Sequence, residues 1–167
     1  RFIPNERAAE IAPALSTRLL ARADGERIFV LHWQGEEGDI ENAVYLSQRD
    51  VRELQFAKAS IATGWSLLVE ELGIDVSEIQ QVLLAGSFGS YLSPASAVRI
   101  GLVPKLALPR IVSAGNVAGE GAKMALLSMQ ERHAATAMFD EVEYVELSDR
   151  EDFNDRFVEE LAFPGAR

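Results

Sequence analysis

Two glycine-rich segments are the most promising places for chemistry in this sequence of 167 residues. Each follows a short apolar stretch and precedes a segment typical of a helix: the first glycine junction is Leu84–Gly89 and the second is Ser113–Gly121. Glycines at the end of a strand let a ligand approach the backbone, and free N–H groups at a helix start favour phosphate. The same residues also suit two ordinary sharp turns. The junctions alone leave both interpretations open.

Lys58 is a further candidate because it is a charged residue at an apolar position of a long predicted helix. One interpretation is that its stem lies along the apolar seam while its ammonium reaches water. The other is that this helix borders a ligand cleft and the ammonium enters it, with Gly64 marking a close helix crossing. The seam, at intervals of three and four residues, is formed by Val51, Leu54, Ile61, Trp65, Leu68 and Leu72.

Conventional catalytic sets are missing from the sequence. It contains no cysteine, which excludes disulfides, thiolate nucleophiles and iron–sulfur ligation by cysteines of these residues. The two histidines, His32 and His133, are expected on an edge strand and a polar helix, and we assign neither a catalytic role. The motifs of zinc proteases, serine hydrolases and P-loop proteins do not occur. The sequence therefore predicts no catalytic residue and no metal ligand.

Charge and hydropathy restrict the partners. A net charge of −10 argues against nucleic acid, since phosphate backbones are bound by Lys and Arg. No run approaches the roughly 20 apolar residues of a membrane span, and no signal peptide opens the sequence, so a cytoplasmic location is expected. Residues 140–160 hold ten acidic and two basic side chains. They form either a solvated face or a docking surface for a basic partner.

The first third of the sequence predicts a hairpin and a long helix. Apolar-rich segments 17–22 and 27–33 are joined by an Asp-Gly pair, which is a strong hairpin signal. A short strand is expected at 43–46. Ser47, with Asp50 three residues later, caps a helix that runs to Leu72 and is ended by Gly73.

The remainder alternates strands with helices. Strands are expected at 82–85, 110–113 and 142–147. Helices are expected from Ser93 to Gly101, from Asn116 to about 130, at 131–139, and after a capping box formed by Ser148 and Glu151. This alternation predicts an α/β fold: a mixed sheet with packed helices and an antiparallel hairpin near the N-terminus.

Five separated blocks of sequence together resemble one known family. In order and spacing they are similar to the C-terminal region of the reductive activators of corrinoid enzymes. Those are ferredoxin-like iron–sulfur proteins fused to an ATPase domain of the actin, sugar-kinase and heat-shock-chaperone superfamily. The blocks are Asp50–Ile61, Leu83–Leu92, Arg99–Pro104, Gly115–Lys123 and Val145–Ser148.

This resemblance covers residues 17–163 and implies one subdomain of the actin-like ATPase, or ribonuclease H-like, fold. Residues 1–16 would then be an extension from a truncated upstream domain, and 164–167 a tail. The resemblance also implies a function. In the family a [2Fe-2S] domain delivers an electron to the Co(II) corrinoid protein of a methyltransferase system, and ATP assists the reduction to Co(I).

The family's adenosine motif is matched by the first glycine junction, and a second connecting segment is matched by residues 115–121. The nucleotide-binding residues expected on this basis are Lys58, Gly86, Ser87, Phe88, Gly89, Gly115, Asn116 and Gly119. Phe88 departs from the chaperone pattern, because it is bulkier than the hydroxyl residue found there.

The two Asp-Gly-rich phosphate motifs of the superfamily and the cluster-binding cysteines do not occur in these residues. The chain is therefore expected to contact only the adenosine side of ATP and to be inactive alone, with the [2Fe-2S] cluster held upstream. A corrinoid protein is the expected partner, and a homodimer is an option. The alternatives are a degenerate actin-like lobe that binds a partner protein without ATP turnover, and a sugar- or acyl-kinase lobe.

Overall fold

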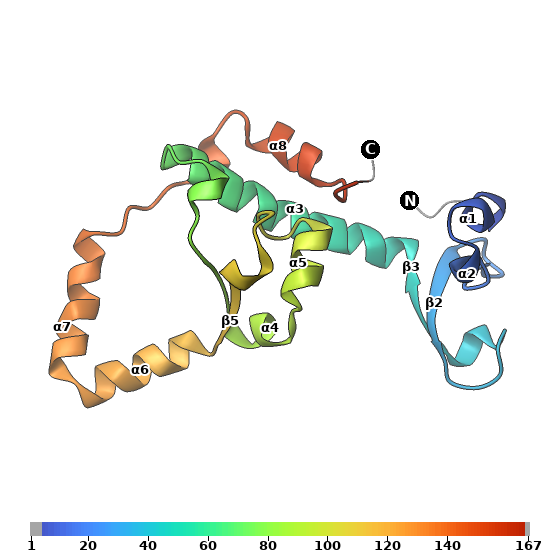
Figure 1. Cartoon of the computed structure of the whole chain (residues 1–167), viewed down its shortest axis with the longest axis horizontal. Helices are drawn as coiled ribbons and strands as arrows, with labels where there is room; N and C mark the ends of the chain where they lie inside the picture. Colours follow the sequence, from blue (N-terminus) through green and yellow to red (C-terminus); the bar gives the residue numbers. More distant parts are fainter. Residues whose placement is uncertain (1–4, 166–167) are drawn as a thin grey trace. The chain divides into compact units, whose positions relative to one another are not determined.

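The computed structural model describes residues 5–165, apart from the side chains of Asn5, Glu6 and Phe88 (Figure 1). The chain divides into two compact units, Arg1–Ala57 and Lys58–Arg167. The boundary between them falls inside the long helix α3 (Gln48–Glu71). The boundaries expected at residues 16 and 163 stay a prediction.

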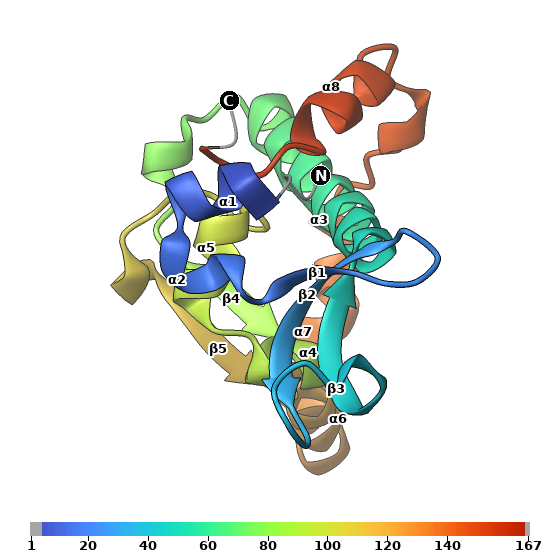
Figure 2. The same ribbon diagram turned by 90° about the vertical axis from the view of Figure 1, so that its right-hand side faces the viewer.

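The first unit contains a three-stranded antiparallel sheet in the order β1-β2-β3 (Figure 2). The hairpin expected near the N-terminus is confirmed, and Gly25 in its turn has a φ of +82°. Ile28 and Val30 are completely buried, while Phe29 between them is half-buried, as the alternation of a strand predicts. The elements are α1 (Asn5–Ile11), α2 (Pro13–Ser16), β1 (Leu19–Ala21), β2 (Arg27–Trp33), a 3₁₀ turn (Ile40–Asn42) and β3 (Ala43–Ser47).

Helix α3 begins and ends where its capping residues predict. The amide of Ser47 donates to the Asp50 carboxylate at 2.8 Å, and the amide of Asp50 donates to the Ser47 hydroxyl at 3.2 Å. Gly73 follows the helix with a φ of +68°. Since Ser47 satisfies a donor that has no partner within the helix, this reciprocal cap fixes the first turn.

The apolar seam expected on α3 is wrong. Four of its residues (Leu54, Ile61, Leu68 and Leu72) are 44% to 72% exposed. The buried face instead carries Lys58, Ala59, Ala62, Thr63 and Leu67. Gly64 does not mark a close crossing of segments: a Cβ there would lie at an ordinary contact distance of 3.8 Å from the side chain of Leu147.

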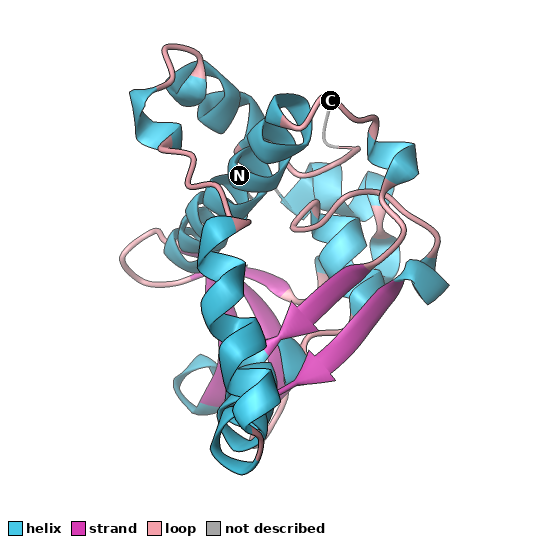
Figure 3. Ribbon diagram, turned by 90° about the vertical axis from the view of Figure 1, so that its left-hand side faces the viewer, coloured by secondary structure: helices cyan, strands magenta, loops and turns pink. Residues whose placement is uncertain are grey.

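The second unit is built around two parallel strands, β4 (Val82–Ala85) and β5 (Ile111–Gly115) (Figure 3). Their inner side chains join the following helices in a small core of Leu84, Ala97, Leu102, Val103 and Ile111. The other helices are α4 (Gly86–Tyr91), α5 (Pro94–Ile100), α6 (Val117–Leu127), α7 (Met129–Ala137) and α8 (Phe153–Glu160), with 3₁₀ turns at Val76–Glu78, Leu108–Arg110, Met138–Asp140 and Leu147–Asp149.

Three expectations for the second unit are corrected. The first helix after β4 was expected to begin at Ser93, but Gly86–Tyr91 already forms the short helix α4. Residues 142–146 are not assigned to any strand of the described chain. The last helix begins after Asp152 without a side-chain cap, because the Ser148 hydroxyl donates to Glu146 within the preceding 3₁₀ turn.

The segment from α6 to residue 144 leaves many large apolar side chains in solvent. No helix of the described residues is long and apolar enough to cross a membrane. Side chains that are more than half exposed here belong to Met124, Leu126, Leu127, Met129, Met138, Phe139, Val142 and Tyr144.

Candidate functional site

The two glycine junctions lie next to each other at one edge of the β4–β5 sheet. The strands are parallel, and Ala85 at the end of β4 is in register with Gly115 at the end of β5. The carboxyl ends of parallel strands are where open α/β sheets bind ligands. The structure therefore brings together both segments singled out from the sequence.

Gly86 and Gly115, the first glycines of the two junctions, both have positive φ. Their φ angles are +84° and +66°, in the left-handed region that favours glycine. A Cβ at either position would meet no heavy atom within 4 Å. Space for a small side chain therefore lies above both glycines, so positive φ rather than crowding is what favours glycine there.

Gly89 has a different role, because it lets α4 pack closely on β4. A Cβ there would lie 2.6 Å from the carbonyl carbon of Leu84, a distance that real Cβ atoms do not show. The hydroxyl of Ser113 donates to the carbonyl oxygen of Gly89 at 3.3 Å and links the two junctions. Ser113 was not predicted as a site residue, although it stands inside the second junction. Close packing of α4 on β4 is therefore enough to explain why position 89 is glycine.

Asn116 and Gly119 form the cap of α6. The side-chain oxygen of Asn116 accepts from the amide of Gly119 at 3.1 Å. A Cβ at Gly119 would lie 2.6 Å from the side-chain nitrogen of Asn116, so a larger residue there would make the Asn116 side chain shift. Both residues are thereby explained by local structure, and a nucleotide contact for them stays a prediction.

Ser87 is exposed on α4, where its hydroxyl is accessible. The side chain of Phe88 lies outside the described part of the chain, and its stacking on a base stays a prediction. No group of three or more metal-ligating side chains occurs among the described residues.

Lys58 is a buried residue of α3 whose ammonium contacts the C-terminal part of the chain. Its side chain is 1% exposed, so the interpretation in which the ammonium reaches water is wrong. The ammonium donates to the backbone oxygen and carboxylate of Glu160 and to the backbone oxygen of Ala162. These acceptors use all three donors of a lysine. A nucleotide contact of Lys58 therefore stays a prediction, with no donor left for it in this arrangement.

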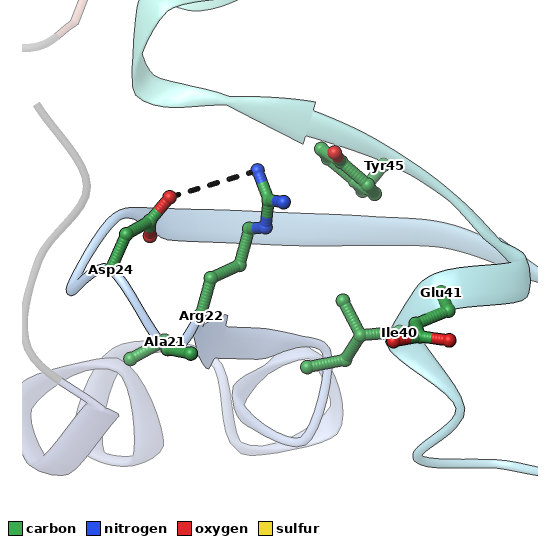
Figure 4. A pocket seen from close by; sticks show the side chains of 7 residues that line it. Ala21, Arg22, Asp24, Ile40, Glu41 and Tyr45 are labelled. Carbon is green, nitrogen blue, oxygen red and sulfur yellow. Dashed lines mark ion pairs between the residues drawn. The ribbon is translucent and has the colours of Figure 1, made fainter.

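A hollow in the first unit was not signalled by any sequence motif (Figure 4). It has a volume of about 590 Å³ and lies between the β1–β2 turn and β3. The guanidinium of Arg22 lies 5.7 Å from the ring centre of Tyr45, and it pairs with Asp24 at 4.0 Å and Glu26 at 3.6 Å. The cation in this hollow is thus already neutralised by two carboxylates. The hollow is lined by Ala21, Arg22, Ala23, Asp24, Ile40, Glu41 and Tyr45.

Three comparisons with known proteins agree. Residues 5–167 match the family described as the C-terminal domain of RACo, the ASKHA domain. The corrinoid activation enzyme RamQ of Eubacterium limosum is 33% identical over 152 residues, which are 91% of this chain and 26% of RamQ. A solved structure of a reductive activator for a corrinoid iron–sulfur protein superposes with a TM-score of 0.75 at 31% identity, covering 88% of this chain and 23% of that one. The chain thus spans about a quarter of the relatives it matches.

Proposed function

This chain belongs to the family of RACo C-terminal ASKHA domains, and on that premise we propose that its two glycine junctions bind the adenosine part of ATP. The whole protein, on this proposal, is a [2Fe-2S] ferredoxin-type activator in the cytoplasm. It reduces the Co(II) form of a corrinoid protein of a methyltransferase system to Co(I) in an ATP-dependent way. The corrinoid protein is the proposed partner.

One observation carries the nucleotide assignment. Gly86 and Gly115 stand side by side at the ends of two parallel strands, both left-handed and both beneath open space. A flat base can lie against a backbone that has no side chains above it. The exposed Ser87 supplies a hydroxyl at the same edge for a polar group of the nucleoside.

The described residues give the phosphates no comparable clamp. The chain contains neither Asp-Gly-rich phosphate motif of the superfamily and no cysteine. Phosphoryl transfer depends on positioned cations and metal ions around the phosphates. We therefore assign to this chain the binding and orientation of the adenosine, and place phosphate chemistry and the iron–sulfur cluster in other parts of the protein.

The test is a titration of the isotope-labelled chain, followed by the amide signals of the two junctions in NMR spectra. Adenosine and ATP are expected to shift the signals of Gly86 and Gly115, whereas inorganic triphosphate is not. Unchanged junction signals with adenosine would contradict the proposal. They would favour the alternative, a degenerate lobe that binds a partner protein without ATP turnover.

A pair of alanine variants separates ligand contact from backbone strain. Gly73 is also left-handed, and a Cβ there would have nothing within 4 Å, but it ends α3 and stands outside both junctions. Gly86→Ala and Gly73→Ala should each lower the unfolding free energy by about 1 kcal/mol, because alanine is strained at positive φ. Only Gly86→Ala is expected to weaken adenosine binding. Equal affinity in both variants would remove Gly86 from the site.

A further inference from the structure

The C-terminal part of the chain folds back along helix α3. We call residues 147–164 the C-terminal strap; it contains the 3₁₀ turn at Leu147–Asp149 and helix α8 (Figure 1). Arg150, near its start, contacts Glu70 and Glu71 at the end of α3, whereas Glu160 and Ala162 contact Lys58. The strap and α3 therefore run in opposite directions, and the strap is attached at two places.

The inner attachment is the ammonium of Lys58. Of its three acceptors, the Glu160 carboxylate and the Ala162 carbonyl oxygen each lie at 3.0 Å. Lys58 is 1% exposed, while the Glu160 side chain is 37% exposed. A buried ammonium is costly unless its donors are satisfied, and two of its three acceptors are backbone oxygens. The ammonium is thus stable in this position only while the strap is in place.

Gly101, at the end of α5, lies beside the inner attachment. It ends α5 with a φ of +75°, and a Cβ there would lie 2.9 Å from the ring of Pro164 and 3.3 Å from Cε of Lys58. Three segments that are distant in sequence therefore meet at one point. The end of the strap, the lysine stem and the end of α5 therefore all border the space beside Gly101.

The outer attachment consists of exposed ion pairs. Arg150 pairs with Glu70 at 3.3 Å and Glu71 at 3.1 Å, and Arg156 also pairs with Glu70. Within the strap, the hydrogen bonds from Arg150 lower the pKa of Asp152 below its ordinary value. The acidic partners on α3 are about half exposed, so salt weakens these pairs. A buried attachment is screened far less.

We propose that Lys58 is the lock of the C-terminal strap: its ammonium is held by the strap and becomes accessible only when the strap opens. The outer ion pairs add a salt-sensitive attachment, which can loosen while the lock stays closed. This role belongs to the fold of the second unit and does not depend on nucleotide binding at the glycine junctions.

Lysine acetylation of the full chain tests the lock directly, because the sequence holds only three lysines: Lys58, Lys105 and Lys123. Mass spectrometry should show Lys58 reacting at least about tenfold more slowly than the exposed Lys105, since reaction requires local opening. The protection should persist in about 0.5 M salt, where the outer pairs are screened. Equal rates at Lys58 and Lys105 would overturn the proposal.

A shortened chain that ends at Glu159 removes all three acceptors of the lock. Acetylation of Lys58 should rise to the rate of Lys105 in this variant. ATP should not slow the reaction in either form. Protection of Lys58 that appears only with ATP would instead assign the lysine to the nucleotide, whatever the outcome of the adenosine titration.

Lys58→Met in the full chain provides a second measurement if the shortened chain does not fold. Hydrogen exchange in α8 should then be about tenfold faster or more, while exchange in β4 changes less. Lys105→Met is the matched control, because Lys105 is exposed. Unchanged protection of α8 in Lys58→Met would show that the lysine does not hold the strap.

Discussion

At the scale of single residues, the glycines of the two junctions separate into two kinds. Gly86 and Gly115 have positive φ and open space, which suits the proposed contact with adenosine. Gly89 and Gly119 have close neighbours and serve packing or capping. Glycine spacing predicted where the junctions are, but it could not separate these roles. The separation depends on how close other segments come, which a single sequence does not contain.

Gly89→Ala should destabilise the second unit by about 1–3 kcal/mol. The added methyl group would overlap the backbone of Leu84, which cannot move without disturbing β4. Gly121→Ala is the matched control: Gly121 is also helical but has nothing within 4 Å, so its replacement should stabilise by up to about 1 kcal/mol. Urea unfolding of both variants measures the difference. Similar midpoints would refute the close approach of α4 to β4.

At the scale of elements, local signals predicted ends of helices better than their buried faces. The capping pair of Ser47 and Asp50 and the left-handed Gly73 place α3 correctly. Its buried face was wrong because large apolar side chains were taken to mark the core, whereas three of its five buried residues are Ala59, Ala62 and Thr63. The contacts of Lys58 could not be predicted either. Its acceptors are about one hundred residues away in the chain, so no local pattern reveals them.

Asp50→Asn should lower the stability of the first unit at neutral pH but not in acid. Hydrogen bonds from Ser47, its backbone amide first, lower the pKa of Asp50 below its ordinary 3.8. A lowered folded-state pKa gives stability that is complete above the unfolded value and is lost as the pH falls through the folded one. The difference in unfolding free energy between the variant and the parent chain should therefore disappear once the pH is below the folded-state pKa of Asp50.

Urea unfolding at neutral pH and at about pH 2 measures this difference. Glu53→Gln, an equal change of charge on the same helix but outside the cap, is the control and should show a smaller dependence on pH. A deficit of Asp50→Asn that is the same at both pH values would mean that the carboxylate charge does not contribute to the cap.

At the scale of the whole molecule, the order of several sequence blocks carried more information than any single motif. The resemblance of five blocks led to the correct family. The α/β fold was predicted separately, from the alternation of strands and helices. The sequence did not reveal the division at Lys58, because no linker composition marks it and it lies inside a continuous helix. Residues 142–146 include Val142, Tyr144 and Val145, whose β-branched and aromatic side chains suit a strand. Strand formation also needs a partner with free backbone groups, which the local sequence does not reveal.

The exposed apolar side chains of α6 give the last prediction. Leu126 and Leu127 are 76% and 84% exposed, next to other exposed apolar residues of the same segment. Exposed apolar patches of this kind favour association of protein molecules. Replacing both leucines with glutamine should reduce concentration-dependent association in sedimentation experiments, and it should change stability by less than about 1 kcal/mol because neither leucine is buried. The control is Leu67→Gln, a completely buried leucine whose replacement should cost several kcal/mol. If the double variant associates as strongly as the parent chain, association does not involve this helix.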